Sequence, residues 1–367
     1  MNKSIIVYAA LLAVGLGASW NRYTSDETTP KEGVVLLEAK AADLQKIGYD
    51  GADLDVNFEM RADDFGRYGW VTAVENKKKK VDGVEQIEVK TTRFKTGSAA
   101  DKLTEAFAPL LALRALDNVD DAKLESFGLK APETLVTVTT TGGTLTLELG
   151  GETYGTKDRY VRVRETSRVY VVKDEAFKSM KFAVTRLPER SLTAAKAEEI
   201  EGLTLGRGAD NVEWSQKNKD DRTAAYWQRT GAPDGKDESF ANWMEKMLKV
   251  KSTGYTQDDE TPTDLVPSFD LTVRVAGKPA ETVRFMTSGD DWYAQSESTR
   301  GVVKLSRGAA KDVADDVDDI LEGREPPKKE KPAPGDPQAK DGPPGRPPGM
   351  PPGMPQRPRM PVPPPHK

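Results

Sequence analysis

Cysteine and histidine, two residue types that often act as nucleophiles, general bases or transition-metal ligands, are almost absent from this 367-residue chain. The chain has no cysteine, and its one histidine, His366, is the second residue from the end. Thiol nucleophiles, Ser-His-Asp triads, histidine-ligated zinc and histidine general bases are therefore excluded from the rest of the chain. Carboxylates are abundant, but the distance between two of them in space is not visible in a sequence. Hydrolysis by a carboxylate pair therefore stays open.

Two glycine-containing patterns resemble parts of known motifs. Gly206 and Gly208 lack the third glycine and the following helix of a dinucleotide-binding loop, and no Gly-x-x-x-x-Gly-Lys-Ser/Thr phosphate loop is present. Lys95-Thr96-Gly97 matches one part of the penicillin-binding-protein motif set, but the Ser-x-x-Lys part is missing. Neither pattern predicts a site.

An acidic run near the end of the second half could supply calcium ligands; it consists of Asp312, Asp315, Asp316, Asp318 and Asp319. The run lacks the Asp-x-Asp-x-Asp-Gly loop and the closing glutamate of a calcium-binding loop. Its spacing follows a helix whose other face is apolar, which predicts a solvated helix face. The sequence therefore predicts no catalytic, cofactor-binding or metal-binding residues, and a protein that is not an enzyme.

One stripe of aromatic and methionine side chains could line a ligand groove or face a core; its members are Phe240, Trp243, Met244, Met247 and Leu248. The spacing of three and four residues places them on one side of a helix, and an amphipathic helix needs such a side for burial. We therefore predict a core-facing stripe. Trp70 and Trp227, near the ends of short strands, are predicted to fill cores as well.

The elements that would position these residues occur twice, first over roughly 34–180 and again over roughly 192–313. Each pass contains a helix, a β-hairpin and a second hairpin that runs into a helix, and such long-period similarity indicates a repeated fold. The sequence predicts an α+β protein with two similar lobes from an internal duplication, in which antiparallel β-hairpins pack against helices. An N-terminal membrane helix precedes them.

Alternation with a period of two residues marks the hairpins. In the first pass, alternating residues from Thr134 onward turn at the pair Gly142-Gly143, which is typical of a hairpin turn. In the second pass, alternation from Phe269 turns near Gly277. The second hairpins are expected over 160–172 and 292–303.

Helices are expected before and after these hairpins. The helices before them are predicted over 103–114 and 240–248 from apolar residues spaced by three and four. The helices after them begin beyond Asp174 and Ser306. Four side chains are candidate caps of these helices: Asp101, Asp174, Ser239 and Ser306.

The N-terminus contains an uncharged 16-residue run from Ile5 to Trp20, after Lys3. As a helix this run spans ~24 Å, which reaches across a ~30 Å hydrocarbon layer if the flanking side chains extend to the interface. The same length fits a cleaved signal peptide, whose best cleavage site, before Ala18, follows Gly15-x-Gly17. We favour an uncleaved signal-anchor, with residues 4–20 in the cytoplasmic (inner) membrane. Since positive flanks stay inside, the body would face the periplasm or the cell exterior.

Charge and composition separate the body from its C-terminal end. Residues 21–325 carry a formal charge of −11, and residues 326–367, rich in proline and glycine, carry +5. A Pro/Gly-rich segment without an apolar face is predicted to be a disordered tail, and an acidic body does not indicate nucleic acid. Lys77 to Lys80 form a second basic cluster, predicted to be a solvated hairpin loop.

These observations divide the chain into five parts. The predicted order is a signal-anchor helix, a linker, two α+β lobes and a tail, over residues 1–20, 21–33, 34–190, 191–323 and 324–367.

One stretch of the first pass resembles a known family. Leu124 to Pro132 reads Leu-Glu-Ser-Phe-Gly-Leu-Lys-Ala-Pro, and the Thr/Val hairpin, Leu149-Gly150 and Arg159 to Arg162 follow it. This order resembles the bacterial family called domain of unknown function 4340, over roughly residues 35–320. Arg186 to Leu192 resembles the family's linker into the next repeat, although Pro188 and Glu189 depart from it. In the second pass, Asp264 to Pro267 only partly matches the Phe-Gly-Leu-x-x-Pro segment.

The resemblance implies no catalytic residues. It implies a membrane-anchored N-terminus and genes that often lie beside those of ABC-transporter and gliding-type components. The motif also has a physical interpretation, since Gly128 suits a helix C-terminus and Pro132 leads out of the helix into a strand.

Two functions remain. The first is a membrane-anchored, non-enzymatic extracytoplasmic accessory protein of an envelope complex, with an ABC transporter as one candidate. Its partners would be the membrane and envelope or transporter proteins, with no cofactor. The second is an extracytoplasmic carboxylate-dependent hydrolase that acts on polysaccharide. A cleft with paired carboxylates would favour the second.

Overall fold

The computed structural model describes residues 33–81, 84–221, 223–232, 235–257 and 259–327. The predicted membrane helix, most of the linker and most of the tail, including His366, lie outside these residues. Within the described ranges, no helix has both the length and the apolar composition needed to cross a bilayer.

Ten strands form the first sheet: β1 Val34–Leu37, β2 Leu44–Asp50, β3 Leu54–Asp63, β4 Gly66–Val81, β5 Val84–Lys95, β6 Leu110–Leu116, β7 Thr134–Thr140, β8 Gly143–Glu152, β9 Arg159–Val163 and β10 Val169–Val172. Their order across the sheet is β1-β6-β10-β9-β8-β7-β2-β3-β4-β5. Each neighbouring pair is antiparallel, so hairpin connections join most of them. The turn at Gly142-Gly143 is confirmed.

Eight strands form the second sheet: β11 Ile200–Arg207, β12 Asp210–Lys217, β13 Tyr226–Arg229, β14 Ser252–Tyr255, β15 Val266–Val275, β16 Glu281–Ser288, β17 Asp291–Gln295 and β18 Val303–Leu305. Their order is β13-β12-β11-β15-β16-β17-β18-β14, again antiparallel throughout. The hairpin around Gly277, formed by β15 and β16, is as predicted. The second hairpin, formed by β17 and β18, is also as predicted.

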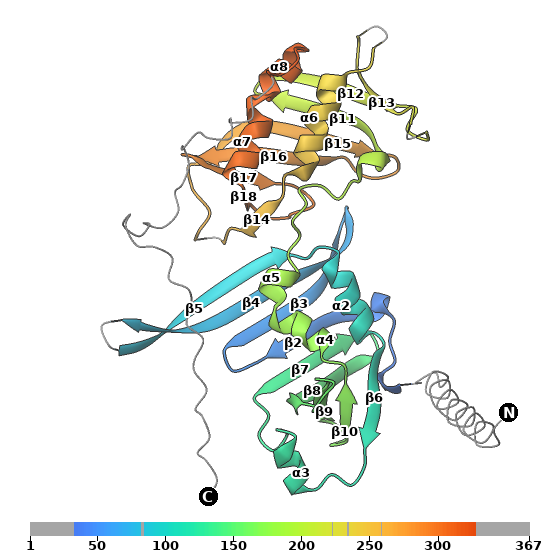
Figure 1. Cartoon of the computed structure of the whole chain (residues 1–367), viewed down its shortest axis with the longest axis vertical. Coiled ribbons are helices and arrows are strands. Elements are labelled where there is room, and N and C mark those ends of the chain that lie inside the picture. Colours follow the sequence, from blue (N-terminus) through green and yellow to red (C-terminus); the bar gives the residue numbers. More distant parts are fainter. Residues whose placement is uncertain (1–32, 82–83, 222, 233–234, 258, 328–367) are drawn as a thin grey trace, which may run out of the picture. The chain divides into compact units, whose positions relative to one another are not determined.

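Helices cover one face of each sheet (Figure 1). The first sheet is covered by α2 Ala99–Phe107, α4 Glu175–Lys181 and α5 Ala183–Arg186, while α3 Asp121–Ser126 precedes β7. The second is covered by α6 Glu238–Lys249, α7 Arg307–Asp315 and α8 Val317–Glu322. Short 3₁₀ turns, η1 Ala41–Asp43 and η2 Ala197–Glu199, precede β2 and β11. The protein is thus mostly β, with helices packed on two antiparallel sheets.

The two sheets repeat one order of connections. Read across the sheets, β6-β10-β9-β8-β7-β2-β3-β4 corresponds to β14-β18-β17-β16-β15-β11-β12-β13. A 3₁₀ turn precedes β2 and β11, a helix precedes β6 and β14, and helices follow β10 and β18. The predicted hairpins of the two passes therefore lie at corresponding places in two sheets of the same strand order. The first sheet differs by its additional edge strands, β1 and β5.

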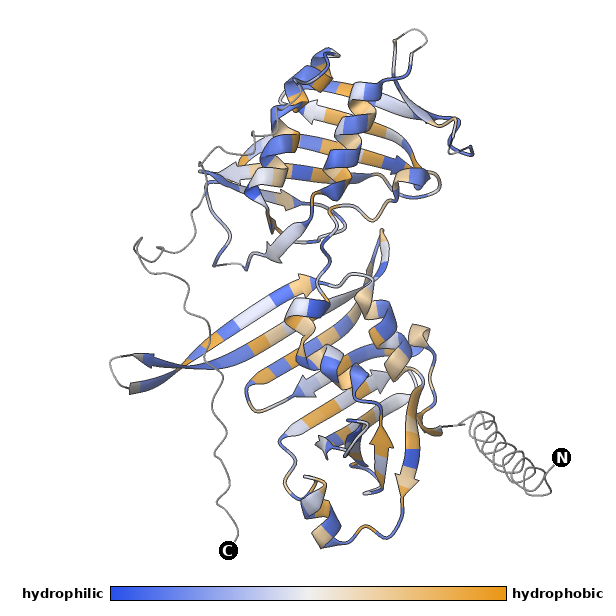
Figure 2. Ribbon diagram, in the orientation of Figure 1, coloured by the Kyte–Doolittle hydropathy of each residue, from blue (hydrophilic) through white to orange (hydrophobic). Residues whose placement is uncertain are grey.

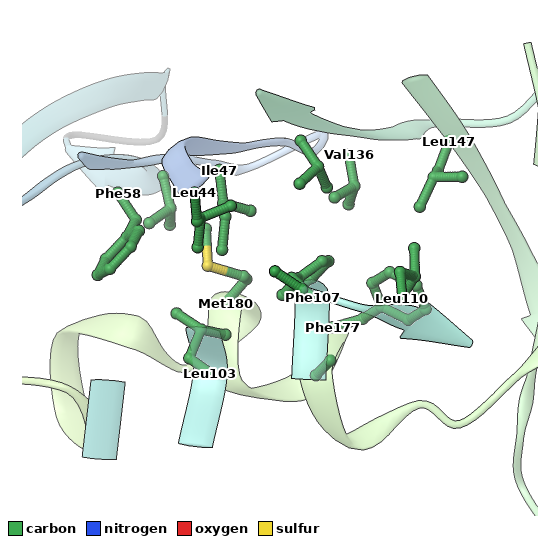
Figure 3. Close-up of a cluster of buried hydrophobic side chains, with 14 of the residues drawn as sticks. Leu44, Ile47, Phe58, Leu103, Phe107, Leu110, Val136, Leu147, Phe177 and Met180 are labelled. Carbon is green, nitrogen blue, oxygen red and sulfur yellow. The ribbon is translucent and has the colours of Figure 1, made fainter. Parts of the chain in front are cut away.

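Alternating side chains build the core of each lobe. Along the central strands, apolar and polar residues alternate (Figure 2), which gives each sheet an apolar face toward its helices. In the first lobe, Ile47, Phe58 and Val136 from the sheet point toward Phe107 and Met180 from the helices (Figure 3), and all five are buried. This contact between sheet and helices fixes the position of α2 and α4.

The prediction of a helix over 103–114 is wrong beyond Phe107. Pro109 has no backbone N–H to continue a helix, and α2 ends before it. Leu110 to Leu116 instead form β6, which pairs with β1 and β10 on its two edges. The apolar run Leu-Leu-Ala-Leu fits either state locally, and pairing on both edges selects the strand.

The candidate caps have different outcomes. Asp101 lies inside α2 and Ser239 inside α6, so both predictions are wrong. Asp237 caps α6, because its carboxylate accepts a hydrogen bond from the backbone N–H of Phe240 at 2.8 Å. Asp174 and Ser306 are the residues before α4 and α7, as predicted, but their side chains make no capping bond.

The acidic run does not form one solvated helix face. The helix breaks at Asp316, which ends α7 and begins α8 and is only 2% exposed. Lys246 Nζ donates to the Asp316 carboxylate at 2.8 Å, so the charge is paired. A buried carboxylate needs such a partner, and the lysine comes from α6, far away in the sequence.

Several contacts join the two sheets, which belong to one compact unit that ends at Pro326. Gln257 pairs with the backbone of Arg93, accepting from its N–H at 2.8 Å and donating to its C=O at 3.4 Å. Arg300 Nε and Nη2 both donate to the carboxylate of Asp63 at 2.7 Å. The guanidinium of Arg300 also lies 4.0 Å from the ring centre of Tyr68.

Candidate functional site

The side chains of the aromatic and methionine stripe lie in the second core, as predicted. Phe240, Trp243 and Met244 are buried, and the Trp243 indole N–H donates to the carbonyl of Val313 at 3.0 Å. Trp227 is buried with them. The stripe therefore stabilises the packing of α6 on the second sheet, and its edge residues Met247 and Leu248 also border a small surface cavity.

Two tryptophans differ from expectation. Trp70 is half-buried, and the Arg61 guanidinium lies 5.1 Å from its ring centre, so it does not fill the first core. Trp214, which was not among the predicted core residues, is fully buried and stacks on Phe240 with ring centres 4.1 Å apart. Its indole N–H donates to Asp237 at 2.8 Å. Its place in an alternating strand was the available signal.

The residues of the two partial motif matches, Lys95-Thr96-Gly97 and Gly206 with Gly208, have structural roles. Thr96 is buried and donates to the carbonyl of Gly69, while Lys95 lies 3.5 Å from the carboxylate of Glu189. Gly208 is in the turn between β11 and β12 with φ 63°, a conformation that favours glycine. Among the described residues, no group of three or more His, Cys, Asp or Glu is arranged to hold a metal ion.

The residues of the Phe-Gly-Leu motif meet the Leu149-Gly150 segment in space. The Phe127 ring stacks on Tyr160 at 4.1 Å, and the Phe127 carbonyl accepts from the N–H of Gly151 at 2.7 Å. Gly128 follows α3 with φ 68°, which confirms its predicted role at the helix C-terminus. A Cβ on Gly150 would lie 2.3 Å from the Phe127 carbonyl oxygen, so only glycine fits there. The motif therefore holds α3 against β8 and β9.

A buried ion pair completes this region. Arg159 donates to both carboxylate oxygens of Asp174, at 2.9 and 3.1 Å, and to the carbonyl of Gly150 at 3.0 Å. Lys178 Nζ lies 3.1 Å from the same carboxylate. A bidentate arginine of this kind fixes geometry, and here it connects β9 to the start of α4.

One pair of carboxylates lies close together, at the end of the β2–β3 hairpin. Asp50 and Asp55 are directly opposite in the strand register, and both are exposed. Partial burial, a hydrogen bond with Asp50 and its negative charge raise the pKa of Asp55. The pair lies at an exposed hairpin end, outside the cavities that the structure describes. The hydrolase considered above would need its carboxylate pair in a cleft.

Two further groups with displaced pKa values lie where the sheets meet. Burial raises the pKa of the Tyr255 hydroxyl, and the negative charge of Glu189 acts in the same direction. The hydrogen bond from Arg300 lowers the pKa of Asp63. Both displacements have a structural cause, namely the packing between the first and second sheets.

A groove of about 790 Å³ lies in the first lobe. Its walls are α2, β6 and α4, with Leu103 and Leu110 buried at its base. Small side chains, including Ala106 and Ala176, keep it open. A concave, mainly apolar surface of this size suits an apolar ligand or an apolar segment of a partner.

The groove adjoins the first described residue of the chain. Gly33 lies in its wall, where an added Cβ would be 2.7 Å from the carbonyl oxygen of Ala112. The next residues are unusually exposed for apolar side chains: Val35 is 54% exposed, and its cross-strand neighbour Leu111 is 46% exposed. We call the surface formed by the groove and by Val34, Val35 and Leu111 the apolar entry face. Exposed apolar patches of this kind mark interaction surfaces.

Charged residues stand at the rim of the groove. Lys102 on α2 and Lys173, just before α4, are exposed and, among the described residues, have no carboxylate partner. Arg186 is held by Glu175 at 3.2 Å. Glu105 is the other acidic residue of the rim.

A second candidate surface is the distal part of the β4–β5 hairpin, which extends beyond the rest of the sheet (Figure 1). Lys77 to Lys80 lie on β4 in this arm and are exposed, so their solvation is as predicted, but they pair with β5 in place of forming a loop. On β5, Ile87 and Val89 are 67% and 61% exposed and point to the same face. We call residues 76–80 and 85–90 the β-arm.

The outer edge of β5 carries backbone groups with no strand beside them in the described part of the chain. Gln257 occupies this edge at Arg93. Along an edge strand, the backbone N–H and C=O groups of every second residue point away from the sheet. Those of Ile87 and Val89 therefore point to the same outer edge as those of Arg93. Such an edge can accept an additional strand from a partner.

Comparison with known proteins gives one match. The model of a family described as domain of unknown function (DUF4340) matches residues 84–268, from β5 into β15. The match includes the Phe127 motif and the segment that connects the two sheets. Neither the search of curated proteins nor the search of solved structures found a match.

Proposed function

Because the chain belongs to the family described as domain of unknown function (DUF4340), which carries no assigned activity, we propose a function from the surfaces of the molecule. We propose that this protein is a non-enzymatic accessory component of an envelope complex of ABC-transporter type. A single N-terminal helix anchors it in the cytoplasmic membrane, and its body faces the periplasm or the cell exterior.

The observation that carries this proposal is the apolar entry face. Gly33 in its wall is joined, through residues 21–32, to the uncharged run from Ile5 to Trp20. Val35 and Leu111 are exposed at that point although both are apolar. An apolar surface next to a membrane anchor is suited to contact with lipid or with apolar parts of a membrane complex.

The β-arm, at the opposite edge of the first sheet from β1, also supports an accessory role. It offers a free strand edge and two exposed β-branched side chains, Ile87 and Val89. Long, exposed apolar edges favour aggregation unless a partner covers them. We infer that a component of the same complex adds a strand to β5.

The repeated strand order also supports an internal duplication. A duplicated pair of lobes gives two related surfaces from one chain, and the first has the additional edge strands β1 and β5. We propose that the first lobe binds the membrane complex. The second lobe stabilises the first lobe through the contacts of Gln257 and Arg300.

Localisation and partner capture test the proposal. We expect the full-length chain, tagged at its C-terminus, to pellet with membranes, to resist extraction with carbonate and to be released by detergent. Cross-linking before solubilisation should then recover membrane transport components, and the I87K/V89K variant should lose them. The matched control is V266K/A276K, which adds the same charge at two exposed positions of the second lobe.

Two results would contradict the proposal. A mature N-terminus near Ala18 or Ser19 would show that the anchor is removed. Recovery of the tagged protein without any membrane component, by the wild type and by the variants alike, would argue against the accessory role.

A further inference from the structure

We propose that the groove of the first lobe binds an acyl chain of an anionic membrane phospholipid, with the headgroup phosphate near Lys102 and Lys173. This inference rests on the proposed membrane anchoring, because it takes the ligand from the bilayer beside the anchor.

The lining of the groove favours a flexible hydrocarbon chain. Leu103, Leu110 and Leu187 are buried along its base, and three alanines, Ala99, Ala106 and Ala176, leave the space above them open. A groove of about 790 Å³ lies within the range of ligand sites. Each methylene group moved from water into such a surface is favourable, so a long acyl chain binds without specific polar contacts.

The position of the groove brings it near the lipid. Gly33 belongs to its wall, and the 12 residues 21–32 separate Gly33 from the apolar run that ends at Trp20. Twelve extended residues reach at most about 40 Å, so the groove stays within that distance of the bilayer. Val35 and Leu111 continue the apolar surface from the groove along the edge of the sheet.

The charges at the rim favour an anionic headgroup. Lys102 and Lys173 are exposed at the groove and, among the described residues, neither has an ion-pair partner. Arg186 is already paired with Glu175, so it is less available. A phosphate between two ammonium groups gains charge-assisted hydrogen bonds, which the single carboxylate of Glu105 does not offset.

The chain's own N-terminal segment is a less suitable occupant. The residues that directly precede Gly33 are Thr29, Pro30, Lys31 and Glu32, which are polar and would have to cross the groove first. The apolar run itself is already assigned to the bilayer in the proposed function. A neutral apolar segment would also gain nothing from the positive charge of the two rim lysines, whereas an anionic headgroup would.

Photo-cross-linking in membranes tests the inference. The full-length protein is reconstituted in nanodiscs that contain phosphatidylglycerol with a diazirine in its acyl chain, and labelled peptides are mapped by mass spectrometry. We expect labelling within 99–113 and 172–187. The variant A106W fills the groove from α2 and should reduce this labelling about tenfold, because an acyl chain loses the burial of several methylene groups.

Two further variants sharpen the test. A309W places the same side chain on an exposed alanine of α7 and should leave the labelling unchanged. K102E/K173E should reduce labelling by phosphatidylglycerol more than labelling by phosphatidylcholine with the same diazirine chain. Circular dichroism and the thermal midpoint of each variant verify folding, and A99W replaces A106W if that variant does not fold.

The inference is overturned if A106W and the wild type are labelled equally, or if the groove peptides are not labelled. In each case, labelling of residues 5–20 by the bilayer would still support the membrane anchor, so failure of the groove and failure of the proposed function are distinguishable.

Discussion

At the scale of single residues, most polar side chains that attract attention in the sequence serve the fold. Asp174 binds Arg159 and Lys178, and Asp316 binds Lys246. Each of these carboxylates is nearly buried, and each lies between two elements. Buried charges persist when they are paired, so these aspartates fix the positions of helices.

Asp55 gives a prediction that depends on pH. Its pKa is raised, so the folded state binds a proton more readily than the unfolded state does, and stability falls as pH rises through that range. D55N removes the repulsion from Asp50 and should stabilise the protein at pH 7 by a few tenths of a kcal/mol. Urea denaturation should show this gain disappearing below about pH 4. D53N in the same turn is the control, and an equal gain in both variants would contradict the explanation.

Gly150 gives a prediction about close packing. G150A would place a Cβ 2.3 Å from the Phe127 carbonyl oxygen, so the α3 segment must move. We expect the free energy of unfolding to fall by about 2 kcal/mol or more, in the range of other overpacked sites. G142A, in an exposed turn with no close backbone contact, should cost much less. Chemical denaturation of the two variants compares them, and equal losses would refute this interpretation.

At the scale of elements, the additions to the first sheet are more informative than the parts that the two sheets share. β1 and β5 are the outer strands of the first sheet, and among the described residues they have no counterparts in the second. β1 carries the exposed Val35, and β5 carries the exposed Ile87 and Val89. The shared strands build most of the cores, and the added strands extend the exposed apolar surface at the two edges of the first sheet.

Substitutions in the β-arm are expected to impair partner binding while leaving the stability of the fold nearly unchanged. In I87K/V89K, both changed side chains are more than half exposed, so the free energy of unfolding should change by less than about 0.5 kcal/mol. The same variant should lose any partner strand that pairs with β5, since lysine on an edge opposes pairing. V71K/F94K in the buried part of the same hairpin should unfold the lobe. Thermal melts of both variants test this contrast, and a large loss of stability in I87K/V89K would show that the arm packs against the body.

At the scale of the whole molecule, the two sheets are held together by a small number of polar contacts. Gln257 binds the backbone of Arg93, and Arg300 binds Asp63. Tyr255 adds an aromatic contact, with its ring centre 6.1 Å from that of Phe94. A polar junction of this kind depends on ionisation more than the apolar cores do.

The Asp63–Arg300 pair gives the expected pH response of this junction. The hydrogen bond from Arg300 lowers the pKa of Asp63, so the unfolded state binds the proton more readily and stability is lost as pH falls through the folded pKa. The stabilisation from this pair is complete at pH values above the pKa of Asp63 in the unfolded state, which is about 4. D63N should therefore cost up to about 1 kcal/mol at pH 7, a modest value because Asp63 is partly exposed. Denaturation at pH 7 and pH 3 should show the difference between wild type and D63N shrinking, and a difference that grows toward pH 3 would contradict this sign.

The hairpins, their repetition and the family are all readable from the order of residues along the chain. Alternation with a period of two residues, interrupted at Gly142-Gly143 and near Gly277, allows few other structures, because side chains of a strand alternate between two faces. The spacing of Phe240, Trp243 and Met247 likewise specifies one buried helix face. The lack of cysteine and the position of His366 limit the chemistry available to the body, since residue types need no coordinates to be counted.

Features that depend on distant partners are set by tertiary packing. Leu110 to Leu116 form a strand because β1 and β10 pair with its two edges, which a local apolar pattern does not reveal. Asp316 is buried at the break between α7 and α8, where Lys246 of α6 pairs with its charge. The groove likewise forms only where α2, β6 and α4 meet, and these elements come from separate parts of the chain. The physical reason is common to all three, since hydrogen bonding, charge pairing and burial are set by neighbours in space, whereas periodicity records only which face of an element is apolar.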